Sequence, residues 1–388
     1  MKIKRQVFLL GCTSFLNDLS SQMIIPILPF FIAILGGGPI AIGLIGAGRD
    51  GVASVMKFLG GYIADRFGNI RPLLFTGYTI AQIGKILFAF AGTPAQVFGI
   101  ATLERFGKGL RAAPKDIVIA EDMGEAKGKG FGFHQMMDRL GAVAGAAFVL
   151  FLLTYYLTDY RTIMIIAGCI GFCSLIPLFF LNPPKPREVK NPRSLPSWSK
   201  LGLPLRKFIA VSAVFAIANF TYMFFILKVG DVYGMDSKGI TLALLLYIFF
   251  TLVQSIFSLP AGILSDRYGR KKALGLGYII FSLTCLGFAS ANSMMMFTAL
   301  FALYGIANAL IAPSEKAIIS DLSGKDNKGS ALGAYYALTG ILFVPGGILA
   351  GVLWTIHPGY TFLMGAGVAL VAMIGLFTVG SPDTKIAK

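Results

Sequence analysis

Three observations predict that this chain is an all-α polytopic membrane protein. Of its 388 residues, 56% are hydrophobic and only 13% are charged, whereas soluble domains carry about a quarter charged residues. Apolar windows of about 20 residues or more, the length that crosses a bilayer as a helix, recur from end to end. The two halves of the chain also repeat the same motifs at a nearly constant offset.

Twelve apolar windows are long enough to be transmembrane helices. A linker rich in proline and basic residues separates two sets of six. We therefore predict an N-terminal six-helix bundle over residues 1–182, a basic cytoplasmic linker over 183–206 and a C-terminal six-helix bundle over 207–388. The predicted spans are 6–35, 39–64, 70–92, 95–120, 129–157, 160–181, 207–230, 237–265, 272–291, 294–319, 328–354 and 359–380.

The first span begins like a signal peptide, with MKIKRQVFLLG. Its apolar run continues beyond signal-peptide length without a cleavage-like end, so we expect a retained helix. Pro26 and Pro29 lack the N–H that a helix needs and predict a kink in its outer part.

Basic residues set the predicted orientation. Of the 34 Lys and Arg residues, 22 fall in segments on the side of the N-terminus and only Arg161, Lys228 and Lys238 on the opposite side. Both termini are therefore predicted to be cytoplasmic. The net charge of +16 reflects these loops, so we expect no nucleic-acid partner.

The halves align at an offset of about 200 residues. GGYIADRFGNIRPLLFTGY matches AGILSDRYGRKKALGLGY, and AAPKDIVIAED matches IAPSEKAIISD. The offset is 201 at the Asp-Arg pairs, 200 at the Gly-Tyr pairs and 199 at the prolines. This pattern predicts parallel repeats about an axis along the membrane normal.

The sequence lacks the residue patterns expected for metal binding, for ATP binding by a P-loop or for enzyme catalysis. The four cysteines all fall in apolar segments; Cys169 and Cys173 share a helical face, which leaves a metal pair conceivable, but the chain has only two His. No GxxxxGK[ST] motif is present, which excludes a P-loop. No nucleophile–base pattern stands out either, so we predict no enzyme activity, no cofactor and no metal.

The whole chain resembles the major facilitator superfamily. The resemblance rests on the 6+6 spans, the basic central linker and the loop motif G-x-x-x-D-R-x-G-R-[RK]. That motif occurs as Gly61–Asp65–Arg66–Gly68 followed by Asn69, and again as Gly262–Asp266–Arg267–Gly269–Arg270–Lys271. The first span, FLNDLSSQMIIPILPFF, resembles drug-efflux-like bacterial and archaeal members. Ala146 follows Gly145, where the antiporter signature has Pro, so the resemblance does not imply antiport.

The resemblance implies alternating access, with a gate formed by Asp65, Arg66, Asp266 and Arg267. Each carboxylate ends a helix, where the helix dipole disfavours negative charge, and would bridge to a helix of the other half. The alternative is that each Asp pairs only with its adjacent Arg as an orientation device.

Thirteen charged residues fall inside the N-terminal spans. An ionised side chain facing lipid costs roughly 2.5–3.5 kcal/mol, so we expect them to line a wet cavity; the alternative for any one of them is an ion pair that only joins helices. Lys85 and Lys115 belong to this set. The candidate substrate and proton pathway is Asp18, Arg49, Asp50, Lys57, Glu104, Arg105, Lys108, Arg111, Asp138 and Arg139.

Helical phase orders the charges of the fourth span. Glu104, Lys108, Arg111 and Lys115 repeat at i, i+4, i+7 and i+11 and share one face, with an acid-first pair at its start. Arg105 points elsewhere. With Gly109 it resembles the superfamily's fourth-span motif, whose arginine serves proton or substrate coupling.

The C-terminal spans carry only Glu315 and Lys316 as clear charges. Their polar side chains suggest a second, aromatic and amide-bearing substrate wall of Asn219, Tyr222, Asn308 and Tyr335. Plain helix packing is the alternative. Away from their ends, the spans together hold nine basic and six acidic residues, which favours an anionic or zwitterionic solute.

Asp18 is the first expected proton carrier, because no charged residue neighbours it in sequence. Asp138 and Asp50 follow, and His134 is interpreted as a surface or packing residue. The sequence thus predicts a monomeric, proton-coupled secondary transporter in the cell membrane that moves a small organic solute, with efflux favoured. The alternatives are an importer of an organic or phosphate-bearing anion, and a transporter-like receptor without turnover.

Overall fold

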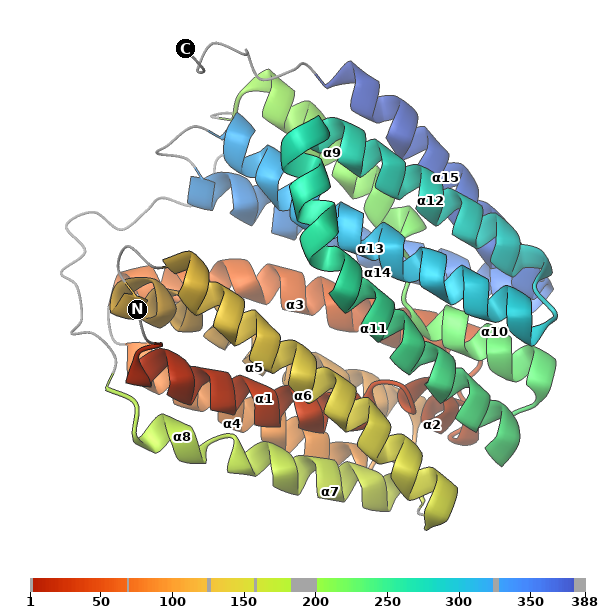
Figure 1. Ribbon diagram of the computed structural model, residues 1–388. Coiled ribbons are helices and arrows are strands. Elements are labelled where there is room, and N and C mark those ends of the chain that lie inside the picture. The colour runs from red at the N-terminus through yellow and green to blue at the C-terminus, as the bar shows by residue number, and fades with distance from the viewer. Residues whose placement is uncertain are drawn as a thin grey trace. The chain divides into compact units, whose positions relative to one another are not determined.

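Every regular element in the described part of the chain is an α-helix, as the computed structural model shows (Figure 1). The structure describes residues 3–67, 70–123, 127–156, 159–182, 201–323 and 328–379. Much of the basic linker predicted over 183–206 lies outside these residues, and its last residues already enter a helix at Leu203. The fold is therefore built by packing helices against helices.

Eight helices come from the first half of the chain. They are α1 (Arg5–Ile24), α2 (Leu28–Ile34), α3 (Pro39–Phe67), α4 (Ile70–Phe88), α5 (Pro94–Met123), α6 (Lys127–Tyr155), α7 (Tyr160–Cys173) and α8 (Ile176–Phe179). The first predicted span is α1 and α2, separated at Ile25–Ile27. The kink predicted from Pro26 and Pro29 is confirmed, since neither proline can supply the backbone N–H of a continuous helix.

Seven helices come from the second half. They are α9 (Leu203–Ala218), α10 (Met223–Tyr233), α11 (Ser237–Tyr268), α12 (Arg270–Ser290), α13 (Met294–Leu322), α14 (Lys328–Ile356) and α15 (Pro358–Thr378). The predicted span over 207–230 is broken at Asn219, which ends α9. The predicted span over 160–181 is likewise divided between α7 and α8.

Contacts group the helices into two compact units. The N-terminal unit holds residues 1–38, 52–193 and 234–248, and the C-terminal unit holds 39–51, 194–233 and 249–388. Each unit therefore includes the first part of one helix, α11 or α3, from the other half of the sequence. In the N-terminal unit α1 packs on α6 and α7, and α4 packs on α5; in the C-terminal unit α12 packs on α13 and α15 (Figure 1).

Glycines allow α1 and α6 to approach closely. A Cβ atom on Gly141 would lie 2.3 Å from the carbonyl oxygen of Phe15, and one on Gly145 would lie 2.1 Å from that of Leu19. No side chain larger than hydrogen fits at either place. The close helix approach expected from the GAVAGAAF stretch is confirmed.

Nine helices in the described residues are long and apolar enough to cross a membrane. The three predicted spans that do not reach this standard are those of α3, α4 and α5, the helices that carry most of the N-terminal charges. Large apolar side chains lie exposed on the outside of others, including Ile374 and Phe377 on α15. Such a surface is typical of helices in contact with lipid.

Candidate functional site

The N-terminal unit encloses a polar cavity of about 160 Å³, here called the N-terminal cavity. Five residues of the predicted pathway line it together: Asp18, Lys57, Lys108, Arg111 and Asp138. The remaining lining residues are Ser14, Asn17, Tyr78, Ala112 and Lys115. Charged residues from four predicted spans thus line one cavity.

One face of α5 supplies three of the cations. Lys108, Arg111 and Lys115 all line the cavity, as expected from their spacing. The Arg111 guanidinium lies 3.6 Å from the centre of the Tyr78 ring, a cation–π contact that holds it while leaving its charge unneutralised. Tyr78 comes from α4, which packs closely on α5 because Gly77 brings no side chain to the contact.

The lining is charged unequally. It holds the cationic side chains of Lys57, Lys108, Arg111 and Lys115 and the carboxyl groups of Asp18 and Asp138. Cations in such numbers repel one another inside a membrane protein and attract negative charge. The cavity is therefore suited to an anionic group, and its carboxylates are suited to hold protons.

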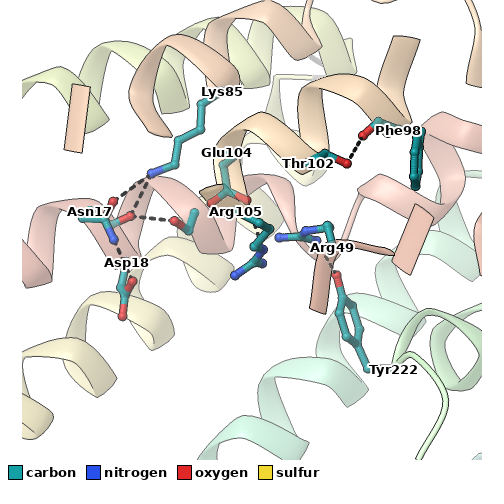
Figure 2. Close-up of polar contacts among 10 residues, drawn as sticks. Asn17, Asp18, Arg49, Lys85, Phe98, Thr102, Glu104, Arg105 and Tyr222 are labelled. Carbon is teal, nitrogen blue, oxygen red and sulfur yellow. Dashed lines mark hydrogen bonds and ion pairs between the residues drawn. The ribbon is translucent and has the colours of Figure 1, made fainter. Parts of the chain in front are cut away.

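Asn17 links Asp18 to a buried lysine (Figure 2). The Lys85 Nζ donates to the Asn17 carbonyl at 3.1 Å and to its Oδ1 at 3.2 Å, while the Asn17 Nδ2 donates to Asp18 Oδ1 at 2.9 Å. Gln82 also donates to Asn17 Oδ1, at 3.0 Å. Lys85 is 1% exposed. The arrangement brings an ammonium group that our site prediction omitted into the network of Asp18.

Glu104 and Arg105 form a buried ion pair on α5 (Figure 2), with 3.1 Å between Glu104 Oε2 and Arg105 Nε. Neither lines the N-terminal cavity. Arg139 lies half-buried on α6 beside Asp138. These residues are close in sequence to cavity residues but occupy different positions in the unit.

Arg49 and Asp50 belong to the C-terminal unit. The buried Arg49 donates through Nη1 to the Tyr222 hydroxyl at 3.2 Å (Figure 2). This contact joins a residue of the predicted pathway to one of the predicted second wall. It also takes Tyr222 away from the other three residues of that wall.

A second cavity, of about 170 Å³, lies in the C-terminal unit and is here called the C-terminal cavity. Three residues of the predicted wall, Asn219, Asn308 and Tyr335, line it together. The other lining residues are Ser212, Phe215, Ala216, Ile311, Ala312, Glu315, Lys316, Thr339 and Phe343. The lining includes two amides, on Asn219 and Asn308, and three aromatic rings, on Phe215, Tyr335 and Phe343.

The carboxylate of Glu315 is the centre of the C-terminal cavity's polar contacts. Its Oε1 accepts from the Tyr278 hydroxyl at 2.9 Å and its Oε2 from the Tyr335 hydroxyl at 2.6 Å. Glu315 is 6% exposed, whereas Lys316, which also lines the cavity, is exposed. Two neutral donors thus stabilise a buried carboxylate, and Tyr278 was missed although its Gly-Tyr motif repeats that of the first half.

The loop motifs are described only in part. The side chains of Asp65, Arg66 and Asp266 lie outside the described residues. Arg267 is exposed, with its guanidinium 5.6 Å from the centre of the Tyr268 ring. The gate therefore stays a prediction.

His134 is not a surface residue. It is 4% exposed, and its Nε2 lies 2.6 Å from Ser14 Oγ, while its Nδ1 lies 3.4 Å from Asp138 Oδ2. Its i, i+4 spacing to Asp138 was the available signal, but the partner on α1 has no sequence signature. In the described residues no three His, Cys, Asp or Glu side chains gather as a metal site.

Family models match nearly the whole chain. The model described as Major Facilitator Superfamily matches residues 10–253 and 239–388. An uncharacterised MFS-type transporter of Methanocaldococcus jannaschii is 40% identical over 96% of this chain and 94% of its own length. A multidrug resistance protein, MdtH, of Shigella dysenteriae is 23% identical over 90% of this chain and 86% of its own.

Solved structures show the same fold. The nucleoside transporter NupG superposes with a TM-score of 0.77 at 18% identity, covering 96% of this chain and 98% of its own. The human organic anion transporter MFSD10 superposes with a TM-score of 0.67 at 16% identity, covering 96% and 99%. At these identities the likeness establishes the architecture and leaves the solute open.

Proposed function

The chain belongs to the major facilitator superfamily, and on that premise we propose that it is a proton-coupled secondary transporter that exports a small organic solute by alternating access. It is a multi-pass membrane transporter and not an enzyme. The proposal includes a plasma-membrane location, cytoplasmic termini and a monomeric state.

The N-terminal cavity is the observation that carries this function. Two carboxyl groups, on Asp18 and Asp138, share its lining with four basic side chains. A carboxylate surrounded by cations and accessible from a cavity can exchange a proton when the surrounding charge changes. Entry or departure of a solute is such a change, so solute and proton occupancy are coupled.

The C-terminal cavity supports a solute with both polar and apolar parts. Asn219 and Asn308 can exchange hydrogen bonds with a polar group, and Phe215 and Phe343 offer apolar contact. Glu315 adds a buried negative charge. We propose that this cavity supplies the second substrate wall.

Export is favoured because MdtH relatives are named as multidrug resistance proteins. A second candidate is import of an organic or phosphate-bearing anion. The excess of cations around the N-terminal cavity favours that candidate, since guanidinium and ammonium groups pair strongly with carboxylates and phosphates.

The test begins with thermal unfolding of the purified protein against ethidium, uridine, benzoate and glycerol 3-phosphate. A ligand present at 100 times its Kd stabilises a protein by about 2.7 kcal/mol, which is readily seen. A solute that binds is then offered to proteoliposomes that contain a pH-sensitive dye. Opposed proton and solute movement supports export by exchange with protons.

Each other outcome selects among the candidates. Proton movement together with benzoate or glycerol 3-phosphate, lost in Arg111→Gln, supports the anion importer. Solute flux without any proton movement contradicts the coupling. Binding without flux supports the receptor that the sequence leaves open.

A further inference from the structure

Three side chains form a connected series beside the N-terminal cavity, here called the relay: Ser14, His134 and Asp138. The distance from Ser14 Oγ to His134 Nε2 is 2.6 Å, and that from His134 Nδ1 to Asp138 Oδ2 is 3.4 Å. Ser14 and His134 are both 4% exposed, whereas Asp138 is half-buried. Ser14 and Asp138 line the cavity, so the series touches it at both ends.

Two packed helices hold the relay in place. His134 and Asp138 lie one turn apart on α6 and therefore share a face. Ser14 lies opposite on α1, at the contact that Gly141 and Gly145 close. The 2.6 Å contact is thus fixed by backbone packing rather than by a flexible loop.

The proposal uses one tautomer of His134. With a proton on Nδ1, the ring faces Asp138 Oδ2, 3.4 Å away, across an ion-pair distance, and a carboxylate oxygen can only accept. Nε2 is then an acceptor, and the Ser14 hydroxyl donates to it. The other carboxylate oxygen, Asp138 Oδ1, makes no hydrogen bond within the part of the chain that the structure describes.

Charged and titratable groups face the relay from every helix packed around it. The cations are on α3 and α5, and a second carboxylate is on α1; the groups are Asp18, Lys57, Tyr78, Lys108, Arg111 and Lys115. Nearby cations oppose an imidazolium at His134. The same cations also oppose a proton on Asp138, but burial disfavours the charged form of both groups. A proton in the relay is therefore expected to rest on Asp138, which it makes neutral, rather than on His134, which it would make a buried cation.

We propose that Ser14, His134 and Asp138 are a proton-binding site that loads Asp138 through His134; this inference rests on the proton coupling proposed above. In the loading step a hydronium ion in the cavity gives a proton to Ser14 Oγ and leaves as water, while Ser14 passes its own proton to His134 Nε2. His134 Nδ1 passes its proton to Asp138 Oδ2. The net change is one proton added to Asp138, with Ser14 restored and the imidazole converted from the Nδ1–H to the Nε2–H tautomer.

The charges of the cavity give the coupling a sign. A protonated Asp138 leaves the cavity more positive, so it favours an anionic solute and disfavours a cationic one. By reciprocity, an anion tightens proton binding and a cation weakens it. An anionic solute therefore travels with the proton, and a cationic solute exchanges for it.

The tautomer change can be measured without any solute. The chain has only two histidines, so ¹⁵N-histidine labelling of the full-length protein gives ring signals for His134 and His357 alone. The His357 Nδ1 accepts from the Gly359 N–H at 3.1 Å, which makes it a control in the Nε2–H form. Lowering the pH should switch His134 from the Nδ1–H to the Nε2–H form without an imidazolium signal.

Substitutions decide whether the relay produces that switch. Asp138→Asn should abolish the switch at His134 and leave His357 unchanged, and Ser14→Ala should shift it to a different pH. Gln135→Ala, an exposed neighbour on α6, should change neither. The proposal is overturned if His134 becomes an ordinary imidazolium on acidification, or if Asp138→Asn leaves its switch intact.

Proteoliposomes separate this site from the proton coupling in general. With whichever of ethidium, uridine, benzoate and glycerol 3-phosphate is transported, His134→Gln should keep solute exchange and lose proton-driven accumulation at least tenfold. Full accumulation in His134→Gln overturns the relay and leaves proton coupling standing. Transport by the wild-type protein without proton movement overturns both.

Discussion

The two repeats place the same Gly-Tyr motif at the same contact and use its tyrosine differently. Gly77 on α4 packs against Gly107 and Arg111 of α5, and Gly277 on α12 packs against Ile311 of α13. Arg111 and Ile311 are 200 residues apart, like the motifs themselves. Duplication has therefore preserved the helix contact and changed the residue that faces the tyrosine.

The change decides what each cavity can bind. In the first repeat Arg111 lies over the face of the Tyr78 ring. In the second, Phe215 stacks on the Tyr278 ring with centroids 4.1 Å apart, and the hydroxyl donates to Glu315. One ring face supports a cation, while the other ring supplies a donor to an acid. The equivalent tyrosines of the two repeats thus have different charged neighbours, a cation in the first and a carboxylate in the second.

Removal of a cation from the N-terminal cavity is expected to have the largest effect on transport. Arg111→Gln should reduce transport by roughly tenfold or more, because a buried charged contact to solute is worth about 1.5–3 kcal/mol. Lys316→Gln, at an exposed position beside the C-terminal cavity, should stay close to wild type. Initial rates in proteoliposomes check the pair, and equal losses would remove the contrast between the repeats.

The tyrosine hydroxyls come next. Tyr278→Phe leaves the buried Glu315 without one of its two donors, and we expect a loss of about 1–3 kcal/mol in unfolding free energy. Tyr78→Phe keeps the ring that Arg111 covers, so its loss should be below about 0.5 kcal/mol. Thermal unfolding in detergent measures both. A larger loss for Tyr78→Phe would mean that its hydroxyl has a role that the contact with Arg111 does not explain.

The glycines sharpen the comparison further. A Cβ on Gly77 would meet the Gly107 carbonyl oxygen at 2.8 Å, whereas one on Gly277 would meet the Ile311 Cγ1 at 2.7 Å. Backbone cannot move aside as a side-chain end can, so Gly77→Ala should cost about 1–2 kcal/mol. Gly277→Ala should cost less than Gly77→Ala, because the Ile311 side chain can shift slightly and the gain in helix propensity offsets part of the strain. Melting temperatures that fall equally would show that both contacts are rigid.

Helix caps should give the smallest effects. Asp159 caps α7 by accepting from the Thr162 N–H at 2.8 Å, and His357 caps α15. Asp159→Ala should cost about 0.5–1 kcal/mol. Donation from the backbone N–H and the hydroxyl of Thr162 lowers the pKa of Asp159. This contribution is therefore complete above the unfolded-state pKa of about 3.9 and is lost as the pH falls through the folded-state pKa.

Unfolding measured from pH 7 down to pH 3 checks this expectation. The difference in unfolding free energy between wild type and Asp159→Ala should shrink towards pH 3. The His357→Ala protein keeps Asp159, so its stability should retain the contribution of that carboxylate and lose it on acidification as the wild type does. A difference that grows on acidification would contradict the assigned sign.

Hydropathy and charge were enough to predict the helices but not their breaks. The kink after α1 followed from Pro26 and Pro29, which alter the backbone directly. The end of α9 at Asn219 did not, because that residue lies in an apolar run whose composition is the same on both sides. An apolar composition predicts that a segment crosses the membrane, but it says little about where the helix within that segment breaks.

The face that a residue occupies on its own helix was predictable, and the pairing of particular side chains from two helices was not. The shared face of Lys108, Arg111 and Lys115 followed from the helical period. The approach of Ser14 to His134 depends on the axial register of α1 against α6. That register is set by side-chain packing over the whole contact, and the spacing of residues within one helix does not predict it.

The glycine contact between α1 and α6 also prevents one helix from sliding along the other. A slide of α6 by one turn, 5.4 Å, would set Met137 or Val149, the larger side chains flanking Gly141 and Gly145, against the carbonyls that those glycines now approach. The register between α1 and α6 cannot shift by a turn, so we expect the two helices to move together as one rigid body. Any conformational change of the transporter then has to come from hinges elsewhere, and the proposed relay lies on a pair of helices that keeps its shape.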